Sequence, residues 1–296
     1  MLRFKDPAGK RICLWLILFF VIAVVVQVCV DCNVLQKSLE IILNVPDRYT
    51  ETFGDLLRYV GFFYHFDYLM IFGFFFFQIL IIFIAPIGGA LFCRRLKTIM
   101  SMEASRYPSK KKLITTKMLE YSAYVSLGTY IGFLIVFIAA CFLCPVADDI
   151  NGVQYRTLFC DWFGNDFYMN FRHAYWLLEG TVKYLFIPFV YSLFSCSLSF
   201  AVSKTYLVYF LPIVYWFGGT ILGYFVHQID PNIFQYFSPS FIMACSGEVV
   251  TILVFIPHLI ILLLTQNVAS SAMLLIKDCG SLVVRLITVA MSMNGQ

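Results

Sequence analysis

Six stretches of this chain are apolar over roughly the 20 residues that an α-helix needs to cross the hydrocarbon core of a bilayer. They cover residues 12–30, 68–92, 120–143, 175–202, 206–226 and 249–264. Only 13% of the 296 residues are charged, against roughly 25% in soluble proteins, which leaves too few polar groups to cover a water-soluble body. We therefore expect an all-α polytopic membrane protein with six transmembrane helices, folded as a single domain over residues 1–296.

The two ends of the chain need separate interpretation. Residues 271–293 are apolar but interrupted by Lys277, Asp278 and Arg285. We expect an amphipathic helix at the membrane surface here, and a short seventh span is the alternative. The first apolar stretch follows basic residues, as in a signal peptide, but no small-residue cleavage site follows it. We expect an uncleaved anchor.

Charge in the connecting segments predicts the orientation. Segment 94–117 carries eight Lys or Arg residues and one acid, and the N-terminus carries four basic residues and one acid. The segments 31–67, 145–174 and 227–248 are richer in acids. Because basic residues favour the cytoplasmic side, the N-terminus, segment 94–117, Lys204 and the tail are expected there. Both termini are then cytoplasmic, which agrees with an even number of spans.

Two ionisable side chains fall inside the fourth stretch. Glu179 precedes Lys183 by four residues in its outer half, which is the favourable order for an ion pair on one face of a helix. Ionisable groups in a span are costly and often functional. The pair is either a satisfied ion pair close to the outer interface or a polar part of a translocation path. Kinks are expected at the prolines inside apolar stretches, which are Pro86, Pro188, Pro212 and Pro257.

Catalytic and cofactor motifs are missing from the sequence. It has no phosphate loop of the form GxxxxGK[ST], no GxGxxG, no HExxH and no GxSxG. We therefore expect no enzymatic activity and no cofactor in this chain. The only compact candidates for an enzymatic site, His65–Asp67 and Asp148–Asp149, are expected to be solvated residues of outer loops.

Two CxxC pairs occur at the outer ends of the first and third stretches, Cys29–Cys32 and Cys141–Cys144. On a helix, residues three apart share a face, which suits either a zinc site or a disulfide. Cysteine is also a small apolar residue that is often buried. With no histidine nearby in sequence, we expect no metal, and an outer disulfide stays an alternative.

The positive-inside rule explains the lysines of the segment between the second and third stretches, but it does not explain the order of the other residues there. Ile99, Met100 and Met102 precede Glu103, and Pro108 follows before the lysine run. This order predicts a short amphipathic helix that ends near Pro108, then a polar turn, then a helix that enters the bilayer. A short helix held just below a membrane is a docking element.

The chain resembles the permease subunits of type-2 ABC exporters, especially those of Gram-positive bacteria. The resemblance rests on this segment, on the following LITTKMLEYSAYVSLGTYIGFLIVF and on the aromatic FQYFSPSF. The resemblance implies a short cytoplasmic coupling helix at residues 97–108, between spans two and three. It also implies a helix along the inner surface at residues 2–11. The residues that it implies for contact with an ATPase are Met102, Glu103, Arg106 and Tyr107.

The same resemblance implies partners and a location. ATP and Mg would be bound by a separate pair of ATPase subunits, and a second permease copy or a related permease would complete the transporter. The expected location is the bilayer of a bacterial plasma membrane, with no nucleic acid partner. The expected cargo is a peptide, an antibiotic-like molecule or a lipid-like molecule.

Two other classes of function stay open from the sequence. A self-sufficient secondary transporter would need an inverted repeat and ionisable groups near the midplane. No clear repeat is visible, and the apolar stretches hold few charges. An integral membrane enzyme or a non-transporting anchor is the third alternative.

Overall fold

The computed structural model describes residues 6–31, 66–70, 74–98, 110–144 and 160–227, and every regular element in these ranges is a helix. The predicted all-α class is thus confirmed for this part of the chain. In chain order the helices are α1 (Pro7–Asp31), α4 (Phe66–Tyr68), α5 (Phe75–Ile84), α6 (Ile87–Thr98), α7 (Lys110–Leu143), α8 (Cys160–Asn170), α9 (Arg172–Thr181), the π-helix η4 (Val182–Phe186), α10 (Ile187–Ala201) and α11 (Thr205–His227).

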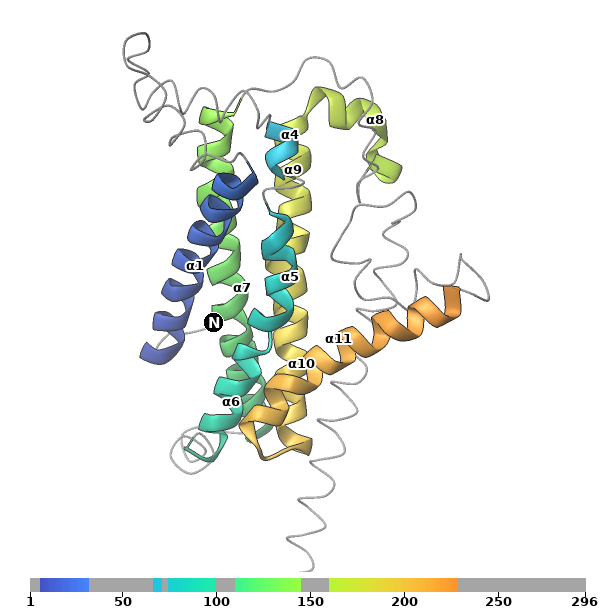
Figure 1. Ribbon diagram of the computed structural model, residues 1–296. Coiled ribbons are helices and arrows are strands. Elements are labelled where there is room, and N and C mark those ends of the chain that lie inside the picture. The colour runs from blue at the N-terminus through green and yellow to red at the C-terminus, as the bar shows by residue number, and fades with distance from the viewer. Residues whose placement is uncertain (1–5, 32–65, 71–73, 99–109, 145–159, 228–296) are drawn as a thin grey trace, which may run out of the picture.

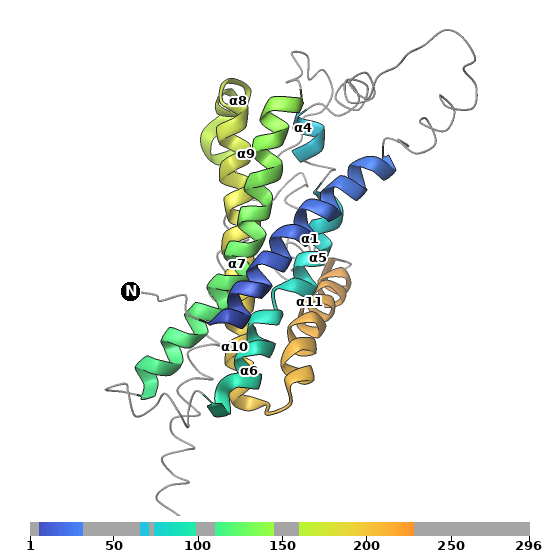
Figure 2. The same ribbon diagram turned by 90° about the vertical axis from the view of Figure 1, so that its left-hand side faces the viewer.

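The helices pack as a bundle in which α7 contacts α1, α6, α9, η4 and α10 (Figure 1). The segment α9–η4–α10 forms one continuous column, and α5 and α6 lie beside it (Figures 1 and 2). An aromatic cluster of Phe20, Phe74, Phe133 and Tyr184 fills the interior. Its ring centroids lie between 4.9 and 5.7 Å apart. Such ring pairs add about 0.5–1.5 kcal/mol each beyond the burial of area, so this cluster helps to join elements distant in sequence.

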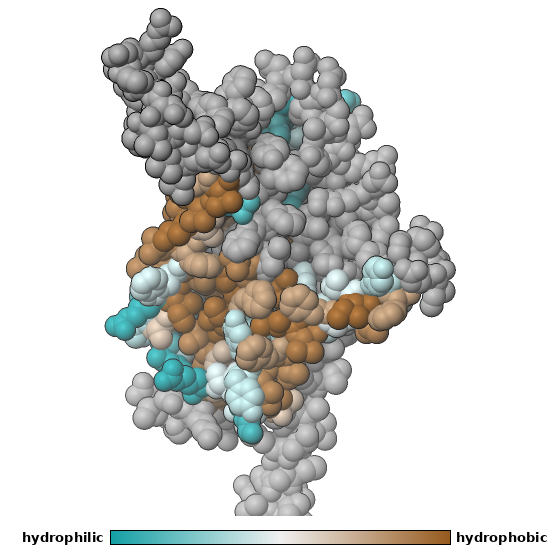
Figure 3. Space-filling view, in the orientation of Figure 1, coloured by the Kyte–Doolittle hydropathy of each residue, from teal (hydrophilic) through white to brown (hydrophobic). Residues whose placement is uncertain are grey.

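Four helical segments in the described part of the chain are long and apolar enough to cross a membrane. They are Pro7–Val30, Lys112–Leu143, Arg172–Ala201 and Thr205–Leu222, and they match the predicted first, third, fourth and fifth spans. Their outward faces carry exposed apolar side chains, such as Leu14 (68%) and Phe142 (86%), and Figure 3 shows a broad hydrophobic surface over the bundle. A membrane-embedded helical protein explains this surface. The predicted sixth span, 249–264, and the tail, 271–293, lie outside the described residues.

The second predicted span, 68–92, is not one uninterrupted helix. Helix α5 ends at Ile84, a turn follows at Ala85 and Pro86, and α6 begins at Ile87. Because proline has no N–H and its ring crowds the preceding turn, the predicted kink forms at Pro86. A Cβ atom on Gly89 would overlap the backbone of Ser195 in α10. The glycine therefore lets the two helices approach closely just after the turn.

Hydroxyl groups satisfy the carbonyls that two other prolines leave without a helical donor. In a regular α-helix Pro188 and Pro212 would face the carbonyls of Tyr184 and Val208, but proline has no N–H to donate. Thr129 of α7 donates to the Tyr184 carbonyl at 2.7 Å. Similarly, Ser195 donates to the Val208 carbonyl at 3.0 Å. These bonds remove the cost of unpaired backbone groups in an apolar interior.

The start of α7 differs from the prediction. The lysines 110–112, predicted to lie in a polar turn, belong to the first turn of the helix, which has 34 residues. At about 1.5 Å per residue the helix is about 51 Å long, whereas a hydrocarbon core is about 30 Å thick. Lysine is a good helix former, so the helix continues beyond the apolar stretch that defines the span.

Basic side chains gather at the end of the bundle where α6 ends and α7 begins. Lys10 and Arg11 lie near the start of α1, Arg94 and Arg95 lie near the end of α6, and Lys204 lies between α10 and α11. Two contacts join these places: the Arg95 Nη1–Asp6 Oδ1 ion pair at 2.8 Å, and the Cys93 thiol 3.8 Å from the Ser203 carbonyl oxygen. The hydrophilic patches at the lower edge of Figure 3 lie at this end. The predicted cytoplasmic groups that the structure describes thus share one end.

Candidate functional site

A buried ion pair lies inside the bundle on the column formed by α9 and η4. The Lys183 Nζ atom is 2.5 Å from Glu179 Oε1, and the two side chains are 7% and 1% exposed. The predicted pairing is therefore present. Glu179 Oε2, the other carboxylate oxygen, has no hydrogen-bond partner among the described residues. A buried carboxylate normally accepts several hydrogen bonds, so Glu179 is only partly satisfied.

The helix changes type where the pair sits. Residues Val182–Phe186 form a π-helix, and the Ile187 N–H donates to the Val182 carbonyl, five residues back. The ring of Pro188 crowds the carbonyl four residues before it, and the wider π turn relieves this crowding. Because π turns insert an extra residue into a turn and occur often at functional sites, the π turn supports Lys183 as a candidate functional residue.

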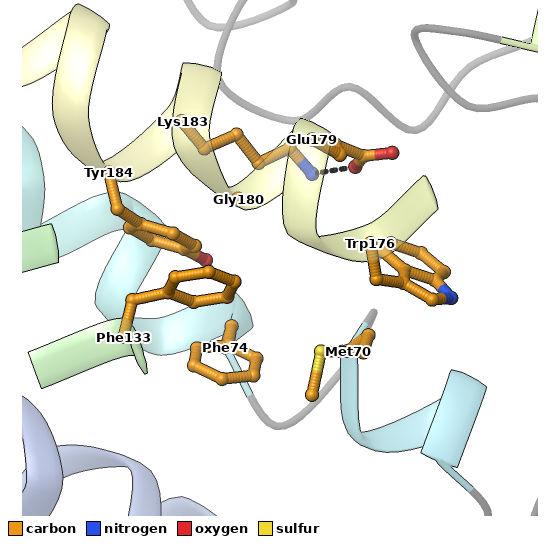
Figure 4. Close-up of a pocket in the computed structure, with 8 residues that line it drawn as sticks. All are labelled: Met70, Phe74, Phe133, Trp176, Glu179, Gly180, Lys183 and Tyr184. Atoms are coloured by element: carbon orange, nitrogen blue, oxygen red, sulfur yellow. Dashed lines mark ion pairs between the residues drawn. The ribbon is translucent and has the colours of Figure 1, made fainter. Parts of the chain in front are cut away.

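A small cavity borders the ion pair (Figure 4). Its empty volume is about 190 Å³, including the part open to the surroundings. The side chains around it are four aromatic rings (Phe74, Phe133, Trp176 and Tyr184), Met70, the backbone at Gly180, and the pair itself. A Cβ atom on Gly180 would overlap the Phe133 ring. Glycine at this position lets the ring lie against the helix and shape the cavity wall.

A second buried charged group lies on the same column, nearer the end of the bundle opposite the basic end (Figure 1). Asp67 accepts hydrogen bonds from Tyr168 Oη at 2.8 Å, Trp176 Nε1 at 2.9 Å and Arg172 Nη1 at 3.3 Å. Asp67 and Arg172 are 8% and 7% exposed. The prediction that Asp67 is a solvated loop residue is therefore wrong. Its carboxylate joins α4 to α8 and α9, which a solvated group would not do.

The two groups together form a polar column in an apolar bundle. Arg172, Trp176, Glu179 and Lys183 follow at helical spacing on α9 and η4, so they share a face. Trp176 belongs to both groups, because its Nε1 atom bonds Asp67 and its ring borders the cavity. The two acids and two bases balance in formal charge. Sequence reasoning identified Glu179 and Lys183 as a pair, but it assigned Asp67 to a solvated loop and did not single out Arg172 or Trp176. Asp67 is 105 residues from Arg172, so their contact depends on the tertiary fold.

A third polar group ties the N-terminus to the basic end. Asp6 accepts from the Ala8 N–H at 3.0 Å, in the manner of an N-cap, and pairs with Arg95 at the end of α6. The Tyr121 hydroxyl of α7 also donates to it. One carboxylate thereby holds α1, α6 and α7 together at the end of the bundle.

The predicted coupling residues Met102, Glu103, Arg106 and Tyr107 lie outside the described residues. The structure does place the ends of their segment, since α6 stops at Thr98 and α7 starts at Lys110, both at the basic end (Figure 1).

The described cysteines of the CxxC motifs, Cys29, Cys141 and Cys144, are free thiols, and Cys32 lies outside the described residues. Within the described ranges no three His, Cys, Asp or Glu side chains gather as a metal site would require. Comparison with known proteins gives no match among family models, curated proteins or solved structures.

Proposed function

We propose that the chain is the membrane-spanning subunit of a transporter that is driven by a separate ATPase and exports a peptide, antibiotic-like or lipid-like substrate. The observation that carries the proposal is the Glu179–Lys183 pair, which is buried in a helix apolar enough to cross a membrane. Ionisable groups at such depth are rare and mark substrate or ion paths.

The geometry of the pair supports a functional role over a purely structural one. Its partners are four residues apart on one column, so their attraction does not join separate helices. Taking two charges out of water costs several kcal/mol per ion, and an apolar replacement of a buried pair is often neutral or stabilising. A bundle that needed only to pack would gain nothing from this pair. The Asp67 group, in contrast, does connect separate elements.

The basic end of the bundle supports coupling to a cytoplasmic partner. The segment 99–109 starts from α6 and leads into α7, and α7 contacts four other helices and η4. Asp6 links α6 to α1 and α7 at the same end. A force applied to segment 99–109 would therefore move several helices of the bundle as rigid bodies, and not one loop alone.

Reversing the charge at Glu103 is expected to separate the chain from its ATPase. If Glu103 contacts basic residues of the ATPase, the arginine of Glu103→Arg places a like charge against them. Such a contact between like charges costs several kcal/mol of binding free energy at an interface. The ATPase that co-purifies with the wild-type chain from native membranes should be lost, and deletion of residues 99–107 should have the same effect. The matched control is Asp166→Arg, the same change in charge at an exposed site on α8. Retention of a bound and coupled ATPase by Glu103→Arg would contradict the coupling assignment.

A transporter driven by an ion gradient is a second candidate, and the buried pair of titratable groups is the observation that favours it. A carboxylate and an ammonium in contact can each take up or release a proton, which is the chemistry that proton-coupled transport uses. Purified chain in sealed vesicles separates the two proposals. Uptake driven by a proton gradient with no ATPase present would favour this second candidate, whereas dependence on ATP and on the partner would favour the first.

A further inference from the structure

The Glu179 carboxylate and the cavity beside it have the chemistry of a site for an organic cation. Aromatic faces attract cations through the negative charge of their π-systems, and a desolvated contact of this kind contributes more than an exposed one. Four aromatic rings border the cavity, and one of them, Trp176, is the best cation acceptor among the side chains. Its indole N–H bonds Asp67 at 2.9 Å, which fixes the ring in place.

The carboxylate supplies the opposing charge. Glu179 is 1% exposed and lines the same cavity, and its Oε2 oxygen has no hydrogen-bond partner among the described residues. The rings of Phe74, Phe133 and Tyr184 lie on one side of the cavity in Figure 4, with Met70 and Trp176 on the other. A buried carboxylate in the lining of an aromatic cavity favours a positively charged group.

In the described state the Lys183 ammonium occupies this position. Its Nζ atom is 2.5 Å from Glu179 Oε1, and its side chain is part of the cavity lining. Much of the empty volume of about 190 Å³ is open to the surroundings, and the enclosed part has room for no more than about one water molecule. A typical ligand pocket is far larger, at about 300–1,000 Å³. A ligand can therefore enter only if the Lys183 side chain leaves. Because Lys183 lies within the π turn Val182–Phe186, a change of helical register would move it away from Glu179.

We propose that this cavity binds the alkylammonium group of an organic cation, and that Lys183 is the internal ammonium that the ligand displaces from Glu179. The proposal deepens the function proposed above, since it names cationic amphiphiles as the substrate class. The binding step needs no ATPase. It can therefore fail while the coupling assignment holds, and the coupling assignment can fail while binding holds.

Binding of choline to the purified full-length chain tests the site. The chain is held in a non-ionic maltoside detergent, so that no lipid head group competes, and binding is followed by equilibrium dialysis. The uncharged tert-butyl isostere of choline serves as the matched control, because it has the same shape without the charge. The wild-type chain should bind choline at least about tenfold more tightly than the isostere, since only choline gains the cation–π and carboxylate contacts.

Two variants assign the binding to this cavity. In Lys183→Met the internal competitor is gone, so choline should bind at least about tenfold more tightly than to the wild type. In the double variant Glu179→Gln/Lys183→Met, which removes both charges of the pair, choline binding should fall to the level of the isostere. If Lys183→Met does not fold, the test compares the binding of choline and of the isostere to the wild type and to the double variant. Equal binding of choline and isostere by every folded variant, or choline binding that survives in the double variant, would overturn the proposal.

Discussion

Asp67→Ala is expected to lower the free energy of unfolding by about 3–5 kcal/mol, the range found when one partner of a buried ion pair is removed. Asp67 accepts hydrogen bonds from Tyr168, Trp176 and Arg172. Its loss leaves the Arg172 guanidinium, which is 7% exposed, without its carboxylate. The substitution also removes the link between α4 and the α8–α9 region. Unfolding in detergent, followed by tryptophan fluorescence, measures the effect.

Two control variants distinguish the loss of the buried Asp67 contacts from the loss of any acidic side chain. Asp166→Ala removes an exposed carboxylate from α8, and a change within about 0.5 kcal/mol is expected there. The double variant Asp67→Ala/Arg172→Met removes both charges, so it should recover much of the stability that Asp67→Ala loses. If Asp67→Ala and Asp166→Ala are equally stable, the Asp67 network has no role in holding the fold.

Single substitutions in the Glu179–Lys183 pair are expected to cost as much as Asp67→Ala, while removal of the whole pair should cost little. Glu179→Gln removes the carboxylate that faces the buried Lys183 ammonium, and Lys183→Met removes the ammonium that faces the buried Glu179 carboxylate. Each should lower the free energy of unfolding by about 3–5 kcal/mol. The double variant Glu179→Gln/Lys183→Met should be close to the wild type or more stable, because both desolvation costs disappear.

The double-mutant cycle gives the coupling energy between the two residues. Unfolding of the four proteins in the same detergent supplies it. Additive losses in the cycle would show that the two side chains do not interact, which contradicts the ion pair. A double variant that is as unstable as the single variants would show that the pair holds the fold, and its role in transport would lose its main support.

Local patterns in the sequence predicted the features that depend on neighbouring residues. The spacing of Glu179 and Lys183 predicted their pairing, since side chains four apart lie on one helical face. Proline chemistry predicted the kink at Pro86. Neither prediction needed knowledge of the tertiary fold.

The Asp67 group could not be predicted in this way. Its hydrogen bonds join residues 101 to 109 positions apart. Charge counting in segment 31–67 treats Asp67 as one of several loop acids, because sequence alone does not show which loop residue folds back onto which helix. The same limit hid Asp6, which meets Arg95 and Tyr121 only after three helices have packed.

The bounds of the helices also differ between the prediction from sequence and the structure. An apolar stretch predicts where lipid surrounds a helix, but it does not show where the helix begins or breaks. Helix α7 starts at Lys110, about ten residues before the predicted span, because helix propensity does not depend on hydropathy and lysine is a good helix former. The apolar stretch 68–92 contains a turn at Ala85 and Pro86, so a single apolar stretch covers two helices, although the kink itself was predicted from the proline. The six-span count and the cytoplasmic placement of both termini stay predictions.

Water access to position 183 during the ATPase cycle tests the central claim, that the buried pair lies on the path of an ATP-driven transporter. The measurement uses a Lys183→Cys/Glu179→Gln variant whose native cysteines are serine, purified with its ATPase partner and reconstituted into vesicles. The rate of labelling by a charged, membrane-impermeant maleimide is compared with and without ATP. In the described state position 183 is only 5% exposed, so slow labelling is expected without ATP and faster labelling during turnover. A position that stays unlabelled in both conditions, while ATP is being hydrolysed, would contradict the account.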